Sequence, residues 1–220
     1  MNAITLLERD HRTVEKIFDQ LENLEGDGSS RKKKDLCEQL VRELSVHTAI
    51  EEMIFYPEVK RSIPEAKELV LESLEEHNVV KWELDSIQSL KVGDARLDAK
   101  IKVLKDAVLR HIEEEENVLF PMVREQIEAS KLSDMGKRLG QIKSIAPTRP
   151  HPRAPSQPPA NVVIGMGASV VDRTMDAVRT VVRGHDGERA AKKGHRTTKK
   201  RAPTHAKRAR ARGGRAAHAH

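Results

Sequence analysis

The sequence is poor in the residues that stabilise small secreted domains and β-rich folds. Its 220 residues include one cysteine, Cys37, and 2% are aromatic. A single cysteine excludes an intrachain disulfide and indicates a reducing compartment. No window approaches the roughly 18 uninterrupted apolar residues of a membrane span, and the N-terminus lacks the basic and apolar regions of a secretory signal. We therefore expect a cytoplasmic protein with no membrane span.

Charge is abundant instead and is divided unevenly along the chain. Residues 1–146 carry 23 Lys+Arg and 30 Asp+Glu, a net charge of −7, whereas residues 147–220 carry 17 and 4, a net charge of +13. Glu, Lys, Leu, Ala and Val dominate the first part, a composition typical of helical bundles. The chain therefore combines an acidic body with a basic extension, and each needs its own interpretation.

Apolar spacing and turn signals predict four helices in the body. Their approximate ranges are 5–24, 31–56, 64–90 and 94–121, with a further helical stretch over 122–145. Pro57 and Pro121 should end or bend the second and fourth helices, because the residue before a proline avoids the helical region. Short connections favour antiparallel neighbours. The predicted fold class is all-α: an antiparallel up-down-up-down four-helix bundle over residues 1–145, followed by a disordered basic C-terminal extension.

The extension divides into three predicted segments. Residues 146–160 are Pro-rich and should form an extended, unpacked linker. Residues 161–183 have apolar residues at helical spacing and should form a short amphipathic helix that docks on a partner, a second copy or the bundle. Residues 184–220 are rich in Lys, Arg and Ala and have no larger apolar residue, so they should be disordered.

In each predicted helix a histidine interrupts the apolar stripe: His11, His47, His77 and His111. The stretches HTAIEEMIFYP and HIEEEENVLFP add a glutamate four residues after the second and fourth histidines, namely Glu51 and Glu115. Positions i and i+4 lie about 40° apart around a helix axis, so each pair can reach one point in the interior.

Positions i+5 lie about 140° away from the histidine by the same geometry. Glu52 and Glu116 should therefore face water or a neighbouring helix. In each acidic run one glutamate is expected to point inward, while the others keep that end of the bundle solvated.

Burying four imidazoles and two carboxylates among Leu, Val and Ile is costly unless they share a partner, and a cation is such a partner. Imidazole with carboxylate suits first-row transition metals. Six ligands are too many for one zinc ion but suit two metals bridged by carboxylates, with iron as the natural candidate and manganese as the alternative. A lone core histidine or HxxxE pair is more often structural, so the prediction depends on the repeated joint pattern.

These residues resemble the hemerythrin-like, or HHE, cation-binding domain. The matching pieces are RDH (Arg9–His11), HTAIEEMIFYP, EEH (Glu75–His77) and HIEEEENVLFP, and the resemblance covers roughly residues 1–130. It implies a four-helix bundle with a non-haem di-iron centre in which two glutamates bridge the metals. The implied ligands are His11, His47, Glu51, His77, His111 and Glu115, with Glu51 and Glu115 bridging.

One position departs from the pattern of the oxygen-carrying hemerythrins. They have a further histidine where this chain has Ser73, and serine is a poor iron ligand. The resemblance therefore implies a more open coordination shell at one metal. It favours binding, sensing or reaction with O2, peroxide or nitric oxide over simple reversible oxygen carriage.

The basic extension supports a different hypothesis. Residues 184–220 could contact DNA or RNA phosphates, with affinity falling steeply as salt rises. Residues 147–220 contain no Phe, Tyr or Trp, so such contact should be independent of base sequence. The bundle would then be a metal-stabilised scaffold or sensor. A ferritin-like oxidase fits less well, because that class uses Glu-x-x-His rather than His-x-x-x-Glu.

Overall fold

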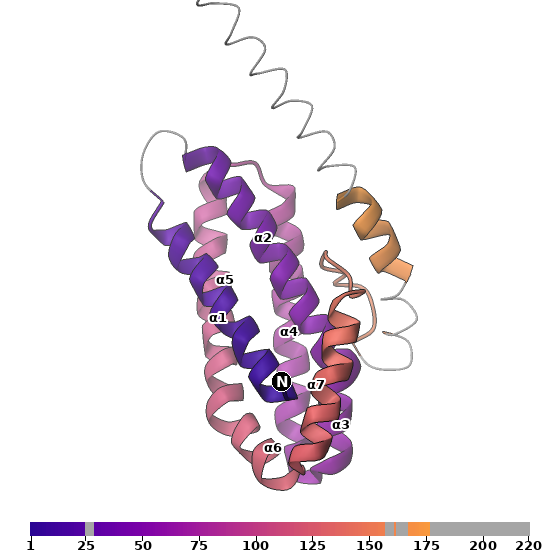
Figure 1. Cartoon of the computed structure of the whole chain (residues 1–220). Helices are drawn as coiled ribbons and strands as arrows, with labels where there is room; N and C mark the ends of the chain where they lie inside the picture. The colour runs from indigo at the N-terminus through magenta and orange to yellow at the C-terminus, as the bar shows by residue number, and fades with distance from the viewer. Residues whose placement is uncertain (25–28, 157–160, 162–166, 177–220) are drawn as a thin grey trace, which may run out of the picture. The chain divides into compact units, whose positions relative to one another are not determined.

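The computed structural model describes residues 1–24, 29–156, 161 and 167–176, and this part of the chain is helical and contains no strand (Figure 1). Four long helices, α1, α2, α4 and α5, pack so that α1 and α4 each contact both α2 and α5. Three shorter helices, α3, α6 and α7, pack with them. The bounds are α1 Ala3–Glu22, α2 Ser29–Ile50, α3 Tyr56–Ser62, α4 Lys67–Ser89, α5 Ala95–Glu114, α6 Phe120–Gln126 and α7 Ala129–Lys143. No helix of the described part is long and apolar enough to cross a membrane.

Helix starts follow local capping chemistry at two of the four long helices. The Asn2 side chain accepts a hydrogen bond from the Thr5 amide at α1, and the Asp94 side chain accepts one from the Arg96 amide at α5. Ser62, which precedes α4, does not cap it, because its hydroxyl donates to the Glu58 carboxylate instead. A 3₁₀ turn, Pro64–Ala66, leads into α4 there.

A widened turn interrupts each half of the body. The residues Glu51–Phe55 and Glu115–Leu119 are π-helical, and the amide of the residue after each segment donates to the carbonyl five residues earlier. Pro57 and Pro121 lie in the first turn of α3 and α6. The prolines therefore follow a change of helical register and do not end the helices.

The π segments also shift the buried stripe by one residue in both halves. An uninterrupted α-helix would turn Ile54 and Val118, three residues after Glu51 and Glu115, towards the core. Instead Phe55 and Leu119 are buried, whereas Val118 is 45% exposed. The extra residue per turn in a π segment rotates every later side chain, and sequence periodicity alone does not reveal this rotation.

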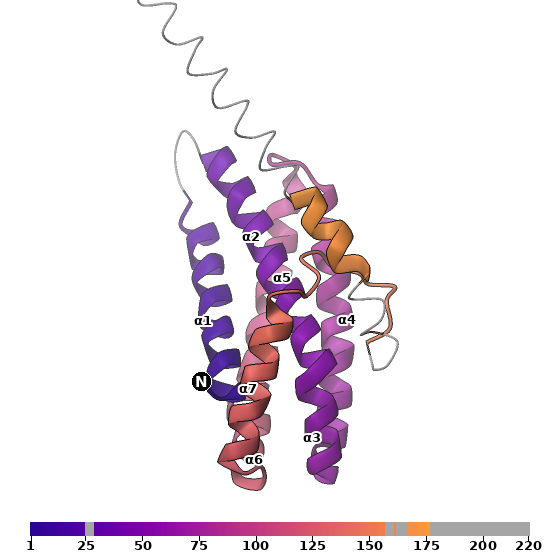
Figure 2. The same cartoon turned by 45° about the vertical axis from the view of Figure 1, so that its right-hand side comes forward.

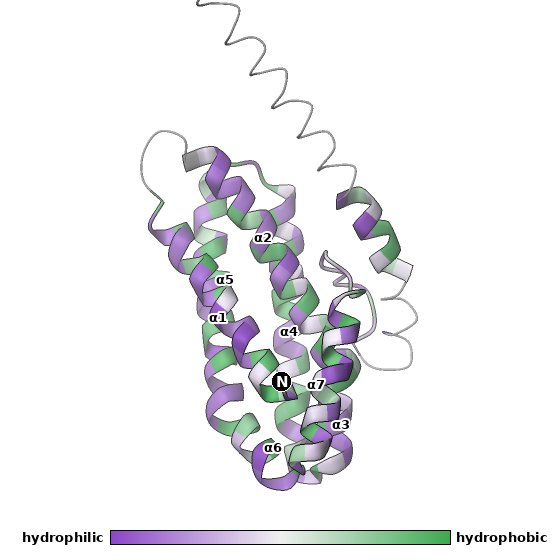
Figure 3. Cartoon of the chain, in the orientation of Figure 1, coloured by the Kyte–Doolittle hydropathy of each residue, from purple (hydrophilic) through white to green (hydrophobic). Residues whose placement is uncertain are grey.

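The buried apolar residues form two clusters with a polar layer between them. One cluster includes Leu7, Ile50 and Phe120, and the other includes Val14, Leu44 and Val108. Apolar and polar residues alternate around each long helix, as amphipathic packing requires (Figure 3). His11 lies between Leu7 and Val14 in the sequence of α1, so the predicted histidine layer separates the clusters.

Residues 146–156, called the strap below, are packed against the helical body. This differs from the extended, unpacked linker that the sequence predicted. Ala146 and Thr148 are buried, and the strap runs across α2 and α4 (Figure 2). Asp172, which is 2% exposed, accepts hydrogen bonds from the Thr148 and Arg149 amides, both at 3.1 Å. The backbone amides of the strap thus find a buried carboxylate partner, which a Pro-rich composition does not reveal.

Residues 167–176 are helical, within the predicted helix 161–183. This helix docks on the body through polar contacts of Asp172 and Asp176, and it leaves Val170, Val171 and Met175 more than half exposed. The remainder of that helix and the predicted disordered segment 184–220 lie outside the described residues.

The first prediction concerns Gly136 of α7, where the helix passes close to the chain's N-terminal turn. A Cβ at this position would lie 2.5 Å from the Met1 carbonyl oxygen and 2.7 Å from the Asn2 carbonyl carbon. We expect Gly136→Ala to lower the free energy of unfolding by about 1–3 kcal/mol through overpacking, measured by chemical denaturation. Gly140→Ala is the matched control, because a Cβ on this glycine of the same helix meets nothing within 4 Å; equal effects would contradict the proposed clash.

Candidate metal centre

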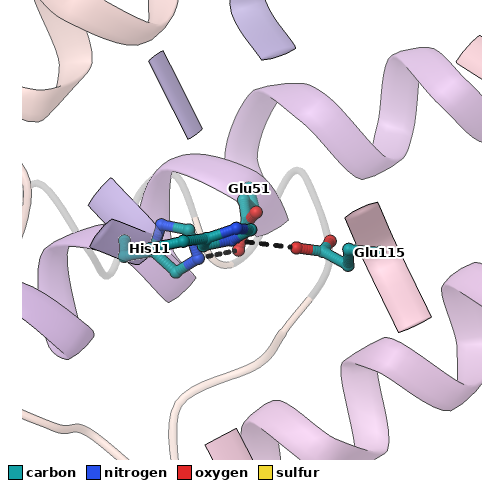
Figure 4. Close-up of side chains that lie close together, drawn as sticks. His11, Glu51 and Glu115 are labelled. Carbon is teal, nitrogen blue, oxygen red and sulfur yellow. Dashed lines mark ion pairs between the residues drawn. The ribbon is translucent and has the colours of Figure 1, made fainter. Parts of the chain in front are cut away.

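The six residues predicted as metal ligands lie at one level of the body. Each of α1, α2, α4 and α5 contributes one histidine, and each π segment contributes its first glutamate. All six are at most 4% exposed: His11, His47, Glu51, His77, His111 and Glu115. Figure 4 shows three of these side chains, His11, Glu51 and Glu115, converging on one point.

The six side chains form two groups that share Glu51. Within each group the candidate ligand atoms lie within 4.8 Å of one another: His11, His47, Glu51 and Glu115 in the first, and Glu51, His77 and His111 in the second. Glu51 Oε2 is 3.1 Å from His47 Nε2 and 3.4 Å from His77 Nε2. The Glu51 carboxylate therefore stands between one histidine of each group.

Glu115 has an equivalent position. Its Oε2 atom is 3.3 Å from His11 Nε2 and 3.6 Å from His111 Nε2. The two carboxylates thus each lie between imidazoles from different groups. Such an arrangement suits two cations with carboxylates between them.

Several of these buried atoms have no hydrogen-bond partner among the described residues. They are His11 Nε2, both ring nitrogens of His47, both carboxylate oxygens of Glu51, and Glu115 Oε2. An unsatisfied buried polar group costs roughly 1–3 kcal/mol, and more when it is charged. His47 Nδ1 faces Asp10, whereas the other five atoms face the shared interior. Five such atoms, all nitrogen or oxygen, fit a transition-metal site.

The other ring nitrogen of each histidine faces a second carboxylate. The Nδ1–oxygen distances are 2.8 Å for His11 and Glu116, 3.2 Å for His77 and Glu52, 2.7 Å for His111 and Glu76, and 3.9 Å for His47 and Asp10. In a neutral imidazole, an Nδ1–H donated to a carboxylate leaves Nε2 unprotonated and directed inward. This is the arrangement that fixes the tautomer and orientation of metal-bound histidines.

Each outer carboxylate is in turn paired with a basic side chain. The pairs are Asp10 with Lys143, Glu52 with Lys81, Glu76 with Arg110, and Glu116 with Arg12. Lys81 is buried, with 8% of its side chain exposed, whereas the other three basic side chains reach solvent. The outer carboxylates thus connect the histidine layer to basic side chains at its edge. Of these four basic side chains, only that of Lys81 is buried.

The second glutamate of each run faces a neighbouring helix, one of the two predicted alternatives, but the predicted solvating role of Glu52 is wrong. Glu52 is 4% exposed and does not help to solvate the bundle; it holds His77. Glu116 is 23% exposed at its side chain and holds His11. The π segments begin at Glu51 and Glu115, so the α-helical angle of 140° does not apply there. Glu113 is exposed, as predicted.

Tyr56 is a residue of this region that sequence reasoning missed. Its hydroxyl donates to Glu115 Oε1 at 2.9 Å and lies 3.2 Å from His77 Nε2. Ser73, predicted to neighbour an open coordination position, donates its hydroxyl to the Leu69 carbonyl and also contacts the Tyr56 phenol. The sequence signal was the difference between the two repeats, since Phe120 occupies the position equivalent to Tyr56 and stacks on His11.

Burial and mutual charge control protonation in this cluster. Burial and the Glu115 charge hold the pKa of Glu51 well above its ordinary value. Burial lowers the pKa of His47 and of His77. Although burial opposes it, the Glu115 and Glu116 carboxylates raise the pKa of His11 to about 9. At neutral pH His11 therefore holds a proton that a cation must displace, and the raised pKa of Glu51 favours its protonated form more than in an exposed glutamate.

Comparison with known proteins agrees with this geometry. An uncharacterised hemerythrin-like protein of Schizosaccharomyces pombe is 27% identical over 169 residues, which is 76% of this chain and 82% of the yeast protein. A DNA nickase of Nostoc sp. is 23% identical over 144 residues, covering 66% of this chain but only 40% of the nickase.

A solved structure supports the same relationship at the level of the fold. The crystal structure of a hemerythrin HHE cation-binding domain-containing protein from Mycobacterium kansasii, an Rv2633c homolog, has a TM-score of 0.55 and 22% identity. It covers 66% of this chain and 88% of the mycobacterial chain. Residues 2–123 match the hemerythrin HHE cation-binding domain family, more than half of the chain. Together with the buried His/Glu cluster this match implies a bound metal cation, and the chain belongs to the hemerythrin HHE cation-binding domain family.

Proposed function

We propose that this protein holds two iron ions, with manganese as the alternative metal, and binds, senses or reacts with O2, peroxide or nitric oxide there. The proposed ligands are His11, His47, Glu51, His77, His111 and Glu115, arranged within an antiparallel four-helix bundle. The observation that carries the proposal is the pair of candidate ligand groups joined by Glu51. A single cation could engage only one of the two groups at close range, because each group gathers its own ligand atoms within 4.8 Å of one another.

The surroundings of the cluster suit a small uncharged ligand. A cavity of about 10 Å³ is lined by all four histidines and by apolar side chains, among them Val14, Leu44, Val80 and Val108. A space of this size holds about one water-sized molecule. Bound iron would supply electrons to such a ligand, while the apolar walls exclude bulk water.

The protein also provides a proton donor beside the cluster. Burial and the Glu115 and Glu51 charges raise the pKa of Tyr56 well above its ordinary value, so its phenol stays protonated. The hydroxyl, next to Ser73, lies on the side that has one histidine fewer than the oxygen carriers. The single phenolic proton is donated to Glu115 Oε1. Turning it from Glu115 towards a ligand on that side would supply a hydrogen bond, which supports sensing or reaction over simple carriage.

The cell compartment follows from the lone cysteine. Cys37 is buried, and burial raises the pKa of its thiol to about 11, so it serves the core and carries no redox role. A cytoplasmic location, where thiols stay reduced, is part of the proposal.

A second candidate function is nucleic-acid contact through residues 184–220, with the bundle as a metal-stabilised scaffold or sensor. Two observations favour it. The segment carries 12 Lys+Arg against 2 Asp+Glu, and the chain is similar over 144 residues to part of a protein named for nicking DNA. The contact would be electrostatic and independent of base sequence.

Metal analysis tests the leading proposal. We expect about two irons per chain by elemental mass spectrometry after anaerobic loading. His111→Ala should lose metal and lower the melting temperature of the loaded protein, because His111 belongs to the buried cluster. Glu113→Ala, an exposed neighbour on the same helix, is the matched control and should do neither. One zinc per chain, no metal, or equal effects of the two substitutions would count against the proposal.

Metal uptake should also release protons at neutral pH. His11, with a pKa of about 9, is protonated in the metal-free protein and must lose its proton to become a neutral ligand. Metal affinity should therefore rise as pH increases towards 9, by up to about tenfold per pH unit for each proton displaced. Calorimetric titration in buffers of different ionisation enthalpy measures the proton count. A count of zero at pH 7 would contradict the assignment.

The tail hypothesis has its own test. Deleting residues 184–220 should abolish salt-sensitive retention on DNA and leave the metal content unchanged, because the charge lies in the tail and the ligands in the body. A full-length variant with the Lys and Arg of 184–220 changed to Gln controls for chain length. Retention that survives both changes would remove this candidate function.

A further inference from the structure

A second pocket lies beside the cluster cavity, between α2, α4 and the strap. Its volume is about 50 Å³, and it is lined by Thr48, Ala49 and Glu52 of the helical body, Lys81 of α4, and strap residues that include Pro150 and Ala154. The space is five times that of the cluster cavity. It is large enough to hold a few small molecules at once.

This pocket is polar enough to hold water. Ser45 Oγ, Arg149 Nε and Asn161 Oδ1 belong to lining residues, and each of these atoms lacks a hydrogen-bond partner among the described residues. Buried water typically occupies sites with several polar partners. Asp172 anchors the roof by accepting bonds from the strap amides and, at 3.1 Å, from His151 Nε2.

Thr48 separates the two spaces. Among the described residues it alone lines both the pocket under the strap and the cavity at the histidines. Its hydroxyl donates to the Ser45 carbonyl at 3.3 Å, and the residue is 3% exposed. A β-branched side chain that is hydrogen-bonded to its own helix has few accessible rotamers. Thr48 therefore forms a barrier one side chain thick, in a fixed position, between the two spaces.

Other approaches to the cluster pass through well-packed apolar residues. Along the helix axes, one apolar cluster with Leu7 and Phe120 lies on one side of the histidines, and another with Val14 and Leu44 lies on the other. Phe120 stacks on the His11 ring at a centroid distance of 5.8 Å. Close packing of this kind leaves few voids for a ligand to cross.

The charged side chains that line the pocket favour an uncharged ligand. Glu52 and Lys81 form an ion pair with a 2.8 Å hydrogen bond, and both are buried in the pocket wall. Because the two charges neutralise each other, they attract neither an anion nor a cation strongly. An uncharged diatomic or peroxide loses less hydration free energy than an ion when it enters the pocket.

We propose that neutral small ligands reach the His/Glu cluster laterally, through the pocket under the strap and past Thr48, which acts as the gate. The inference rests on the proposed function, because it concerns the ligand of that site. Thr48 is neither a metal ligand nor a catalytic residue; it sets the rate at which ligands pass. A gate changes association and dissociation rates equally and leaves the equilibrium constant unaltered.

The test uses full-length, iron-loaded, reduced protein and nitric oxide as the probe. Association is followed by stopped-flow absorbance, and dissociation by chasing with a nitric oxide scavenger. Thr48→Ala removes the wall and should raise both rates by about tenfold, the effect of lowering a barrier by about 1.4 kcal/mol. The ratio of the two rates, the Kd, should change less than about twofold. Thr48→Val keeps the shape and is the matched control, with rates close to the parent.

A second variant tests the route from its outer end. Ala154 belongs to the strap and is only partly buried, so Ala154→Phe should fold and fill the pocket from its roof. Both rates should fall together. Unchanged rates in Thr48→Ala and Ala154→Phe, or a change in Kd with an unchanged association rate, would overturn the proposed route. If the parent protein binds no nitric oxide at all, the proposed function fails instead, so the two failures are distinguishable.

Discussion

A layer of unsatisfied polar atoms between two apolar clusters is the constraint on which the rest of this structure depends. Glu51, Glu115 and four imidazoles converge where water has no access, and several of their atoms lack partners among the described residues. Breaking one partner from a buried charge pair costs several kcal/mol. The protein holds these groups together with outer carboxylates and basic side chains, and their inner atoms then require a cation. Metal binding and the folding stability of the bundle are therefore thermodynamically coupled.

The internal repeat explains how the layer is built. In each half, the acidic residue before the lone histidine supports the histidine of the next long helix: Asp10 faces His47, and Glu76 contacts His111. The second glutamate of each π segment supports a histidine of the other half, Glu52 for His77 and Glu116 for His11. The four outer carboxylates thus cross-link all four long helices. Differences between the halves, Tyr56 against Phe120 and buried Lys81, fall on the His77 side, where the ligand route is proposed.

Sequence reasoning predicted much of this arrangement, because the relevant information was local. Stripe spacing placed the four histidines and the two glutamates correctly, and α1, α2, α4 and α5 begin within about three residues of the predicted starts. Three features could not be predicted from the sequence. Periodicity assumes 100° per residue, so the π segments and the inward turn of Glu52 were missed. Tyr56 looked like an ordinary core aromatic. The strap looked unpacked, because its anchor, Asp172, lies more than twenty residues away.

The central claim is that two metals share the Glu51 and Glu115 carboxylates inside the histidine layer. Anomalous X-ray diffraction at the iron edge, from crystals of the iron-loaded protein, tests it most directly. The account predicts two anomalous peaks about 3.5–4 Å apart, surrounded by His11, His47, His77 and His111. A single peak, or peaks located only at histidines outside this layer, would contradict it.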